Sequence, residues 1–149
     1  MRATNNLGYL LHHLSFVLDR QSDQVLQEQL GIGFSQFKIL MVLRWNTNVQ
    51  QKQIADNLGQ TEASVSRQIK LLKSRGLVAM HKNLSNKRQH LTALTAKGER
   101  LTEAALDILN KYHTPVFARL NEKQREETLN ALSVMHEASC PPHEPDVIN

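Results

Sequence analysis

The sequence predicts a mainly helical chain that carries one small β-hairpin, and three observations support this fold class. Apolar residues recur at helical spacing over most of the 149 residues. The period changes to alternation only after Gly76, and a polar turn separates the two alternating runs. No internal repeat or low-complexity tract interrupts the chain, so residues 1–149 are expected to fold as a single unit.

Residues 51–75 have the spacing of two helices joined by a tight turn. The first helix, 51–58, has apolar residues on one side, and Gly59 ends it. These apolar residues are Ile54, Ala55 and Leu58. A short helix, a turn of about three residues that contains glycine and a second amphipathic helix form the helix-turn-helix pattern.

The second helix of this pair, 61–75, has two different sides. Val65, Ile69 and Leu72 fall in one narrow stripe, which must pack against the rest of the domain. The opposite side is small or polar at its start and cationic later, as a helix that enters the DNA major groove requires. The residues predicted to read the major groove are Ala63, Ser64, Ser66, Arg67 and Lys70.

The predicted hairpin, about 77–94, is a candidate wing. Strands at 77–82 and 89–94 flank a polar turn whose tip carries Lys87 and Arg88. An arginine on a narrow finger suits the electronegative minor groove, so these two residues are predicted to enter it. The residues predicted to contact phosphates are Thr61, Lys73, Arg75 and Lys82.

The positive charge of the chain is concentrated in this part. Residues 50–100 hold ten Lys or Arg against three Asp or Glu, whereas the rest of the chain holds eight against eleven. A focused cationic patch indicates a polyanionic partner. A membrane surface is disfavoured because no Trp- or Phe-rich amphipathic helix accompanies the charge.

From about Leu7 to Ala138 the chain resembles the MarR family of winged helix-turn-helix transcriptional regulators. The matching residues are Phe37, Leu40, Gln53-Ile54-Ala55, Leu58, Val65-Ser66-Arg67, Leu72, Gly76-Leu77-Val78, Leu94-Thr95 and Gly98. Asn86 departs from the aspartate that commonly helps to hold the wing arginine in the family, and Gly33 and Gln50 depart from helix-capping threonines. The resemblance implies a winged helix-turn-helix DNA-binding part at 34–95 and a sequence-specific regulator of double-stranded DNA. The expected mechanism is a ligand-responsive repressor that occludes its operator.

Two helical arms, 4–30 and 96–138, flank this part and carry apolar stripes of their own. Neither arm is expected to belong to the winged-helix core. Their burial against a second copy predicts a homodimer and a near-palindromic operator with half-sites about one DNA turn apart. The alternative is an all-helical monomer that buries the arms internally. Residues 139–149, with three prolines, are expected to form a flexible tail.

Metal and cofactor sites are not expected. None of the seven histidines belongs to a set with metal-ligand spacing, and His81 and His90 are expected to be cross-strand neighbours on the wing. The single Cys140 lies in the proline-rich tail, so neither a disulfide framework nor a catalytic nucleophile is expected. No catalytic residue is predicted, and an enzyme is the least favoured class.

Four aromatic residues could line a small-molecule pocket where the arms meet the winged helix, although core packing is the more common role at such positions. These are Phe16, Phe34, Phe37 and Trp45. The resemblance implies that a small aromatic effector is an option, with unknown binding residues. A non-specific architectural DNA binder is the alternative function, which the acidic balance of the arms disfavours. The chain lacks a signal peptide's apolar core and a run of about 18 apolar residues, so a cytoplasmic location is expected.

Overall fold

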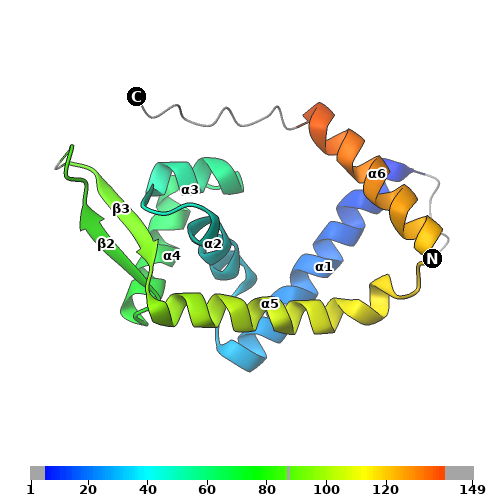
Figure 1. Ribbon diagram of the computed structural model, residues 1–149, viewed down its shortest axis with the longest axis horizontal. Coiled ribbons are helices and arrows are strands. Elements are labelled where there is room, and N and C mark those ends of the chain that lie inside the picture. Colours follow the sequence, from blue (N-terminus) through cyan, green and yellow to red (C-terminus); the bar gives the residue numbers. More distant parts are fainter. Residues whose placement is uncertain (1–5, 87, 140–149) are drawn as a thin grey trace. The chain divides into compact units, whose positions relative to one another are not determined.

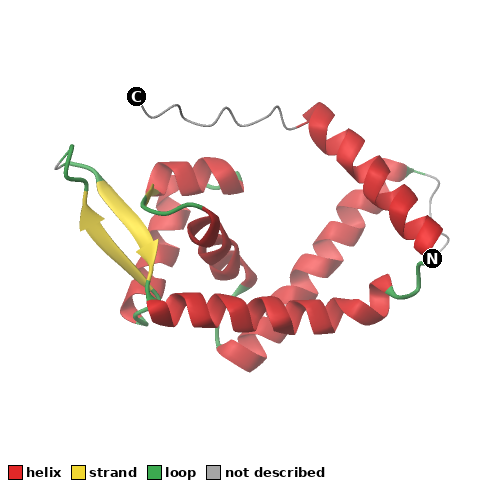
Figure 2. Cartoon of the chain, viewed as in Figure 1, coloured by secondary structure: helices red, strands yellow, loops and turns green. Residues whose placement is uncertain are grey.

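The computed structural model describes residues 6–86 and 88–139, and it is mainly helical with one small antiparallel sheet (Figures 1 and 2). It divides into two compact units, residues 1–110 and 111–149, whereas the sequence predicted one unit. The elements in chain order are α1 (Leu7–Leu30), α2 (Phe34–Trp45), β1 (Val49–Gln50), α3 (Gln51–Leu58), α4 (Glu62–Ser74), β2 (Val78–Lys82), β3 (His90–Leu94), α5 (Ala96–Phe117) and α6 (Glu122–Ser139).

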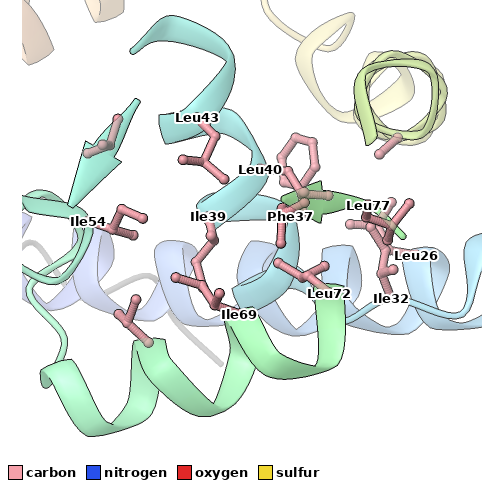
Figure 3. Close-up of a cluster of buried hydrophobic side chains, with 14 of the residues drawn as sticks. Leu26, Ile32, Phe37, Ile39, Leu40, Leu43, Ile54, Ile69, Leu72 and Leu77 are labelled. Atoms are coloured by element: carbon pink, nitrogen blue, oxygen red, sulfur yellow. The ribbon is translucent and has the colours of Figure 1, made fainter. Parts of the chain in front are cut away.

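The core of residues 1–110 forms where α4 packs against α2. Val65, Ile69 and Leu72 of α4 are fully buried, as their spacing predicted. Ile69 and Leu72 point toward Ile39 and Leu40 of α2, which are also fully buried (Figure 3). Each such side chain contributes about 1.5–3 kcal/mol when it leaves water, so this contact fixes the rotation of α4 about its axis.

The sheet has three strands in the order β1-β3-β2. The start of each strand of the β2–β3 hairpin was predicted within one residue. In the structure, Val78 lies opposite Leu94 and Lys82 lies opposite His90. The two-residue strand β1 was not predicted, and it places Val49 opposite Thr92. A strand of two residues is too short to show alternation in the sequence, so only its partner strand could reveal it.

One part of each arm belongs to the winged-helix core, so the expectation that neither arm contributes to it was wrong. Val25 and Leu26 near the end of α1, and Ala105 and Leu109 of α5, lie in the same buried cluster as the residues of α2 and α4. The reason is that α2, α3, α4 and the small sheet leave part of the core uncovered, and the adjoining halves of the two arm helices cover it.

The remaining parts of the arms expose apolar side chains among the described residues. The first half of α1 exposes Leu7, Leu10 and Leu14, and none of the residues of α6 is buried. In residues 111–139 the exposed large apolar side chains are Tyr112, Val116, Phe117, Leu129, Leu132 and Val134.

The wing is joined to α5 by a close backbone contact. Thr95 donates its N–H to the Leu77 carbonyl and its hydroxyl to the Gly76 carbonyl, at 3.1 and 2.6 Å. Gly98, in the first turn of α5, is buried against the same Leu77 carbonyl. A Cβ atom built on Gly98 would lie 1.9 Å from that oxygen, so only glycine allows this approach.

Gly98→Ala is expected to lower the free energy of unfolding by roughly 3 kcal/mol, because the added methyl group must displace backbone atoms of the wing junction. Urea denaturation followed by circular dichroism measures the change. Gly8→Ala is the matched control, because its Cβ meets only Asn6 Oδ1, at 3.4 Å, and alanine is favoured in the helix. Equal midpoints for the two variants would contradict the close contact.

Thr92→Val is expected to raise the free energy of unfolding by about 1 kcal/mol, since the buried Thr92 hydroxyl has no hydrogen-bond partner among the described residues. Thr102→Val is the matched control, because the Thr102 hydroxyl is equally buried but donates to the Gly98 carbonyl at 2.7 Å. The control should lose about 1 kcal/mol. The same denaturation measurement tests both, and a loss for Thr92→Val would show that its hydroxyl does have a partner.

Candidate nucleic-acid interface

The outward side of α4 carries the side chains that were predicted to read DNA bases. Ala63, Arg67 and Lys70 are exposed, whereas Ser64 and Ser66 are half-buried at the flanks. Burial of the opposite stripe of α4 turns these residues away from the core. The structure therefore brings all five predicted major-groove residues together on one accessible helix.

The start of α4 also has the predicted cap. The Thr61 hydroxyl accepts the Ser64 N–H at 3.2 Å, and Thr61 itself is exposed. The positive end of the helix dipole and the remaining free N–H groups of the first turn lie here, and such ends attract phosphate.

The cations on α4 are not neutralised within the described part of the chain. Arg67, Lys70 and Lys73 are exposed and form no ion pair with a carboxylate of residues 6–86 and 88–139. A protein that keeps three unpaired cations on one helix leaves their charge available to an anionic partner.

The wing extends beside α4, since β2 packs against that helix (Figure 1). Arg88 and Lys82 are exposed on the wing, and Lys87 lies outside the described residues. Asn86 Oδ1 accepts the backbone N–H of Arg88 at 3.2 Å. Asn86 thus helps to shape the turn around Arg88 without the carboxylate that the family commonly has.

The turn of the wing is held together by amide groups. Asn83 Nδ2 donates to Gln89 Oε1 at 3.1 Å, and Asn83 Oδ1 accepts the Ser85 N–H at 3.0 Å. These bonds give the tip a defined shape, which a finger that inserts into a groove requires.

The predicted pairing of His81 with His90 was wrong. His81 lies opposite Leu91, and His90 lies opposite Lys82. Because side chains alternate along a strand, His81 and His90 point to opposite faces of the hairpin. His90 shares its face with Lys82.

Arg75 was predicted to bind a phosphate, and the structure gives its guanidinium other partners. Nη1 donates to the Gly31 carbonyl at 2.6 Å, and Nη2 donates to the Leu30 carbonyl at 3.0 Å. The residue remains exposed, but two of its donors are used within the fold. Sequence reasoning missed this contact because it joins residues 44 and 45 positions apart.

Sequence reasoning also missed how α2 is held at its start. Asp23 of α1 accepts the Phe34 N–H at 2.8 Å, and Gln36 accepts the Gly33 N–H at 3.2 Å. At the start of α3, Gln53 likewise accepts the Gln50 N–H at 3.0 Å. Asp23 thus satisfies a first-turn N–H of α2, as a capping threonine would, whereas the two glutamines hold the cap residues Gly33 and Gln50 themselves. The glutamines three residues after each cap position were the available signal.

The four aromatic residues considered for a pocket do not share one environment. Trp45 and Phe16 are 77% and 62% exposed, whereas Phe37 is buried. Phe34 and Phe37 stack on each other with ring centroids 5.8 Å apart. Core packing therefore does not describe Trp45 and Phe16. Trp45 is two positions after the buried Leu43, so it lies on the opposite side of the last turn of α2.

Two further features concern the described residues. No helix within the described residues is long and apolar enough to cross a membrane. In the same part of the chain, no three His, Cys, Asp or Glu side chains are grouped as a metal site requires. Cys140 and the rest of the predicted tail, apart from Ser139, lie outside it.

Comparison with known proteins finds relatives that are named as transcriptional repressors or regulators. An HTH-type transcriptional repressor of Mycobacterium tuberculosis is 27% identical over 121 residues, which cover 81% of this chain and 86% of the relative. MarR of Escherichia coli, solved in its apo form, has a TM-score of 0.78 at 22% identity and covers 94% of this chain and 100% of its own. The predicted resemblance to MarR-family regulators is thereby confirmed in fold.

CouR, a transcriptional repressor, has been solved in two complexes with the same fold. Its complex with a 23-mer DNA duplex has a TM-score of 0.78 at 23% identity and covers 89% of this chain and 93% of that chain. CouR of Rhodococcus jostii RHA1 bound to p-coumaroyl-CoA has a TM-score of 0.78 at 20% identity and covers 97% of this chain and 100% of that chain.

The family model described as "Winged helix DNA-binding domain" matches residues 35–113 of the chain. This range includes the helix-turn-helix, the wing and most of α5, which are the elements that carry the interface described above. The sequence had predicted a DNA-binding protein rather than an enzyme. The chain belongs to the winged helix DNA-binding domain family.

Proposed function

We propose that this chain is a homodimeric transcriptional repressor that binds a near-palindromic operator in double-stranded DNA. The observation that carries the proposal is the unneutralised cationic side of α4, which lies beside a wing with an exposed arginine. The name of the mycobacterial relative, a transcriptional repressor, supports the same role.

Each part of the interface has its own task. Arg67 and Lys70, with Ala63, Ser64 and Ser66, read base edges in the major groove. Thr61, Lys73 and Lys82 hold phosphates and so set the register of the protein on the duplex. Arg88, together with Lys87, enters the adjacent minor groove.

The dimer is formed by the uncovered arm surfaces. Apolar side chains on the first half of α1 and on α6 are exposed in the described part of the chain, and a second copy offers a matching apolar surface. A two-fold axis then repeats α4 about one DNA turn, roughly 34 Å, along the operator. Occlusion of that site represses transcription in the cytoplasm.

A small aromatic ligand releases the repressor from DNA. The support is the CouR structure with p-coumaroyl-CoA, a ligand that contains an aromatic ring, on the same fold that also binds a DNA duplex. The residues of this chain that hold such a ligand are not assigned.

Selection of bound fragments from a random pool of DNA duplexes tests this function. The expected result is enrichment of an inverted repeat whose half-sites are centred about ten base pairs apart. Enrichment without any consensus would identify a non-specific architectural protein. Failure to retain DNA at all would overturn the proposal.

Replacing Arg67 with alanine is expected to weaken binding to the selected operator by about 1–3 kcal/mol and to leave binding to random DNA nearly unchanged, because Arg67 contacts bases. Lys73→Ala, on the same helix, should weaken both kinds of binding alike, because a phosphate contact carries no sequence information. Fluorescence anisotropy with both duplexes measures the two affinities. Equal losses on both duplexes for Arg67→Ala would show that Arg67 does not read bases.

The affinity for the operator is expected to fall steeply with salt, with a slope of log K against log [salt] of about −0.9 for each phosphate contacted. Lys73→Ala should reduce this slope by about 1.8 for the dimer, since one contact is lost from each protomer. Anisotropy titrations between low and physiological salt measure it. A flat response for the unmodified protein would remove the electrostatic basis of the proposal.

A further inference from the structure

Arg75 joins three helix ends in residues 1–110. α1 ends at Leu30, and Gly31 follows it with φ 64 in the left-handed conformation. The Arg75 guanidinium donates to the carbonyls of both residues, and Arg75 is itself the C-cap residue that follows α4. Lys97 of α5 donates its Nζ to the Arg75 carbonyl at 2.7 Å. The end of α4 is therefore bonded on one side to α1 and on the other to α5.

The contact has a clear electrostatic reason. The last carbonyls of a helix have no partner within the helix, and they form the negative end of its dipole. α1 has no basic residue in its last turn, so it cannot neutralise its own end. Arg75 supplies the missing cation, and its planar guanidinium presents donors to two carbonyls at once, which an ammonium group cannot do with the same geometry.

We propose that Arg75 is a positioning residue that sets the angle of α4 against α1, and does not act as a phosphate ligand. This inference rests on the proposed function, because α1 belongs to the arms of the dimer. By fixing α4 to α1 in each protomer, Arg75 sets the separation of the two α4 helices and hence the half-site spacing that the dimer accepts.

The two possible roles of Arg75 compete with each other. Two of the five guanidinium N–H groups of Arg75, one on each terminal nitrogen, already hold the two carbonyls at 2.6 and 3.0 Å. A phosphate that took these two N–H groups would release the end of α1. The exposed Lys73 has no such bond to a carbonyl among the described residues. Lys73 thus binds the DNA backbone, whereas Arg75 holds α4 at the angle to α1 that fits the operator.

The spacing of the operator gives the first test. The selected operator and versions with one base pair inserted or removed between its half-sites are titrated with the unmodified protein, Arg75→Ala and Arg75→Lys. Arg75→Ala is expected to bind the selected operator about tenfold more weakly, to lose most of its preference for the selected spacing and to keep the salt slope of the unmodified protein. Arg75→Lys should restore only part of the preference, because lysine keeps the positive charge but lacks the planar guanidinium that donates to two carbonyls at once.

The salt slope separates the two roles. A slope reduced by about 1.8 in Arg75→Ala, as expected for Lys73→Ala, would show that Arg75 binds phosphate and would overturn the inference. Full restoration by Arg75→Lys, or an unchanged spacing preference in Arg75→Ala, would overturn it as well. If the unmodified protein selects no operator, the proposed function itself has failed.

A measurement without DNA makes the test independent of the operator. A spin label on Glu62→Cys, in a Cys140→Ser background, reports the distance between the two α4 helices of the dimer by electron paramagnetic resonance. Arg75→Ala is expected to turn one narrow distance distribution into a broad one. Ile69→Val is the control, because it lowers stability within α4 but leaves the Arg75 contacts in place, and it should keep the narrow distribution.

The outcomes of this measurement are distinct. A narrow distribution in Arg75→Ala, identical to that of the labelled parent, would overturn the positioning role while leaving the dimer intact. The absence of any distance between protomers in the labelled parent would instead refute the homodimer of the proposed function. Equal broadening by Ile69→Val would show that lost stability, and not the Arg75 contact, controls the angle of α4.

Discussion

Burial of one stripe of α4 is the constraint on which the interface depends. Val65, Ile69 and Leu72 leave water completely, and on a helix with 100° between successive residues this fixes where every other side chain points. Arg67 and Lys70 face outward because the opposite side of α4 is anchored in apolar packing. Their orientation is therefore set by the core, at about 1.5–3 kcal/mol for each buried side chain, and not by their own charge.

The parts of the fold that sequence could predict are those with a local periodic signal. The helix pair, the turn at Gly59 and the two wing strands all follow from residue spacing within about fifteen positions. The cationic side of α4 follows from the same signal. By contrast, His81 and His90 were placed as partners because the length of a turn does not fix the register, and one residue of difference in register reverses the face on which a side chain lies.

The rest of the structure depends on contacts between distant parts of the chain, and no local pattern reports them. Arg75 has the same charge and a similar exposure to Lys73, and only the carbonyls of Leu30 and Gly31, more than forty positions earlier, give it a different environment. The exposure of Trp45 is a second case. Core packing is the more common role of an aromatic residue at such a position, but Trp45 is 77% exposed because it lies on the side of α2 opposite the buried Leu43.

The entry of the arms into the core changes how the DNA-facing helix is controlled. Val25 and Leu26 of α1 belong to the same buried cluster as Ile69 and Leu72 of α4, and this apolar contact is non-directional. Such packing resists separation of α1 and α4 more than it resists their rotation. The hydrogen bonds from Arg75 depend strongly on angle, so they supply the orientational restraint that the apolar contact lacks. A change in the contacts of this one side chain, with the apolar core intact, is therefore enough to alter the angle between α1 and α4.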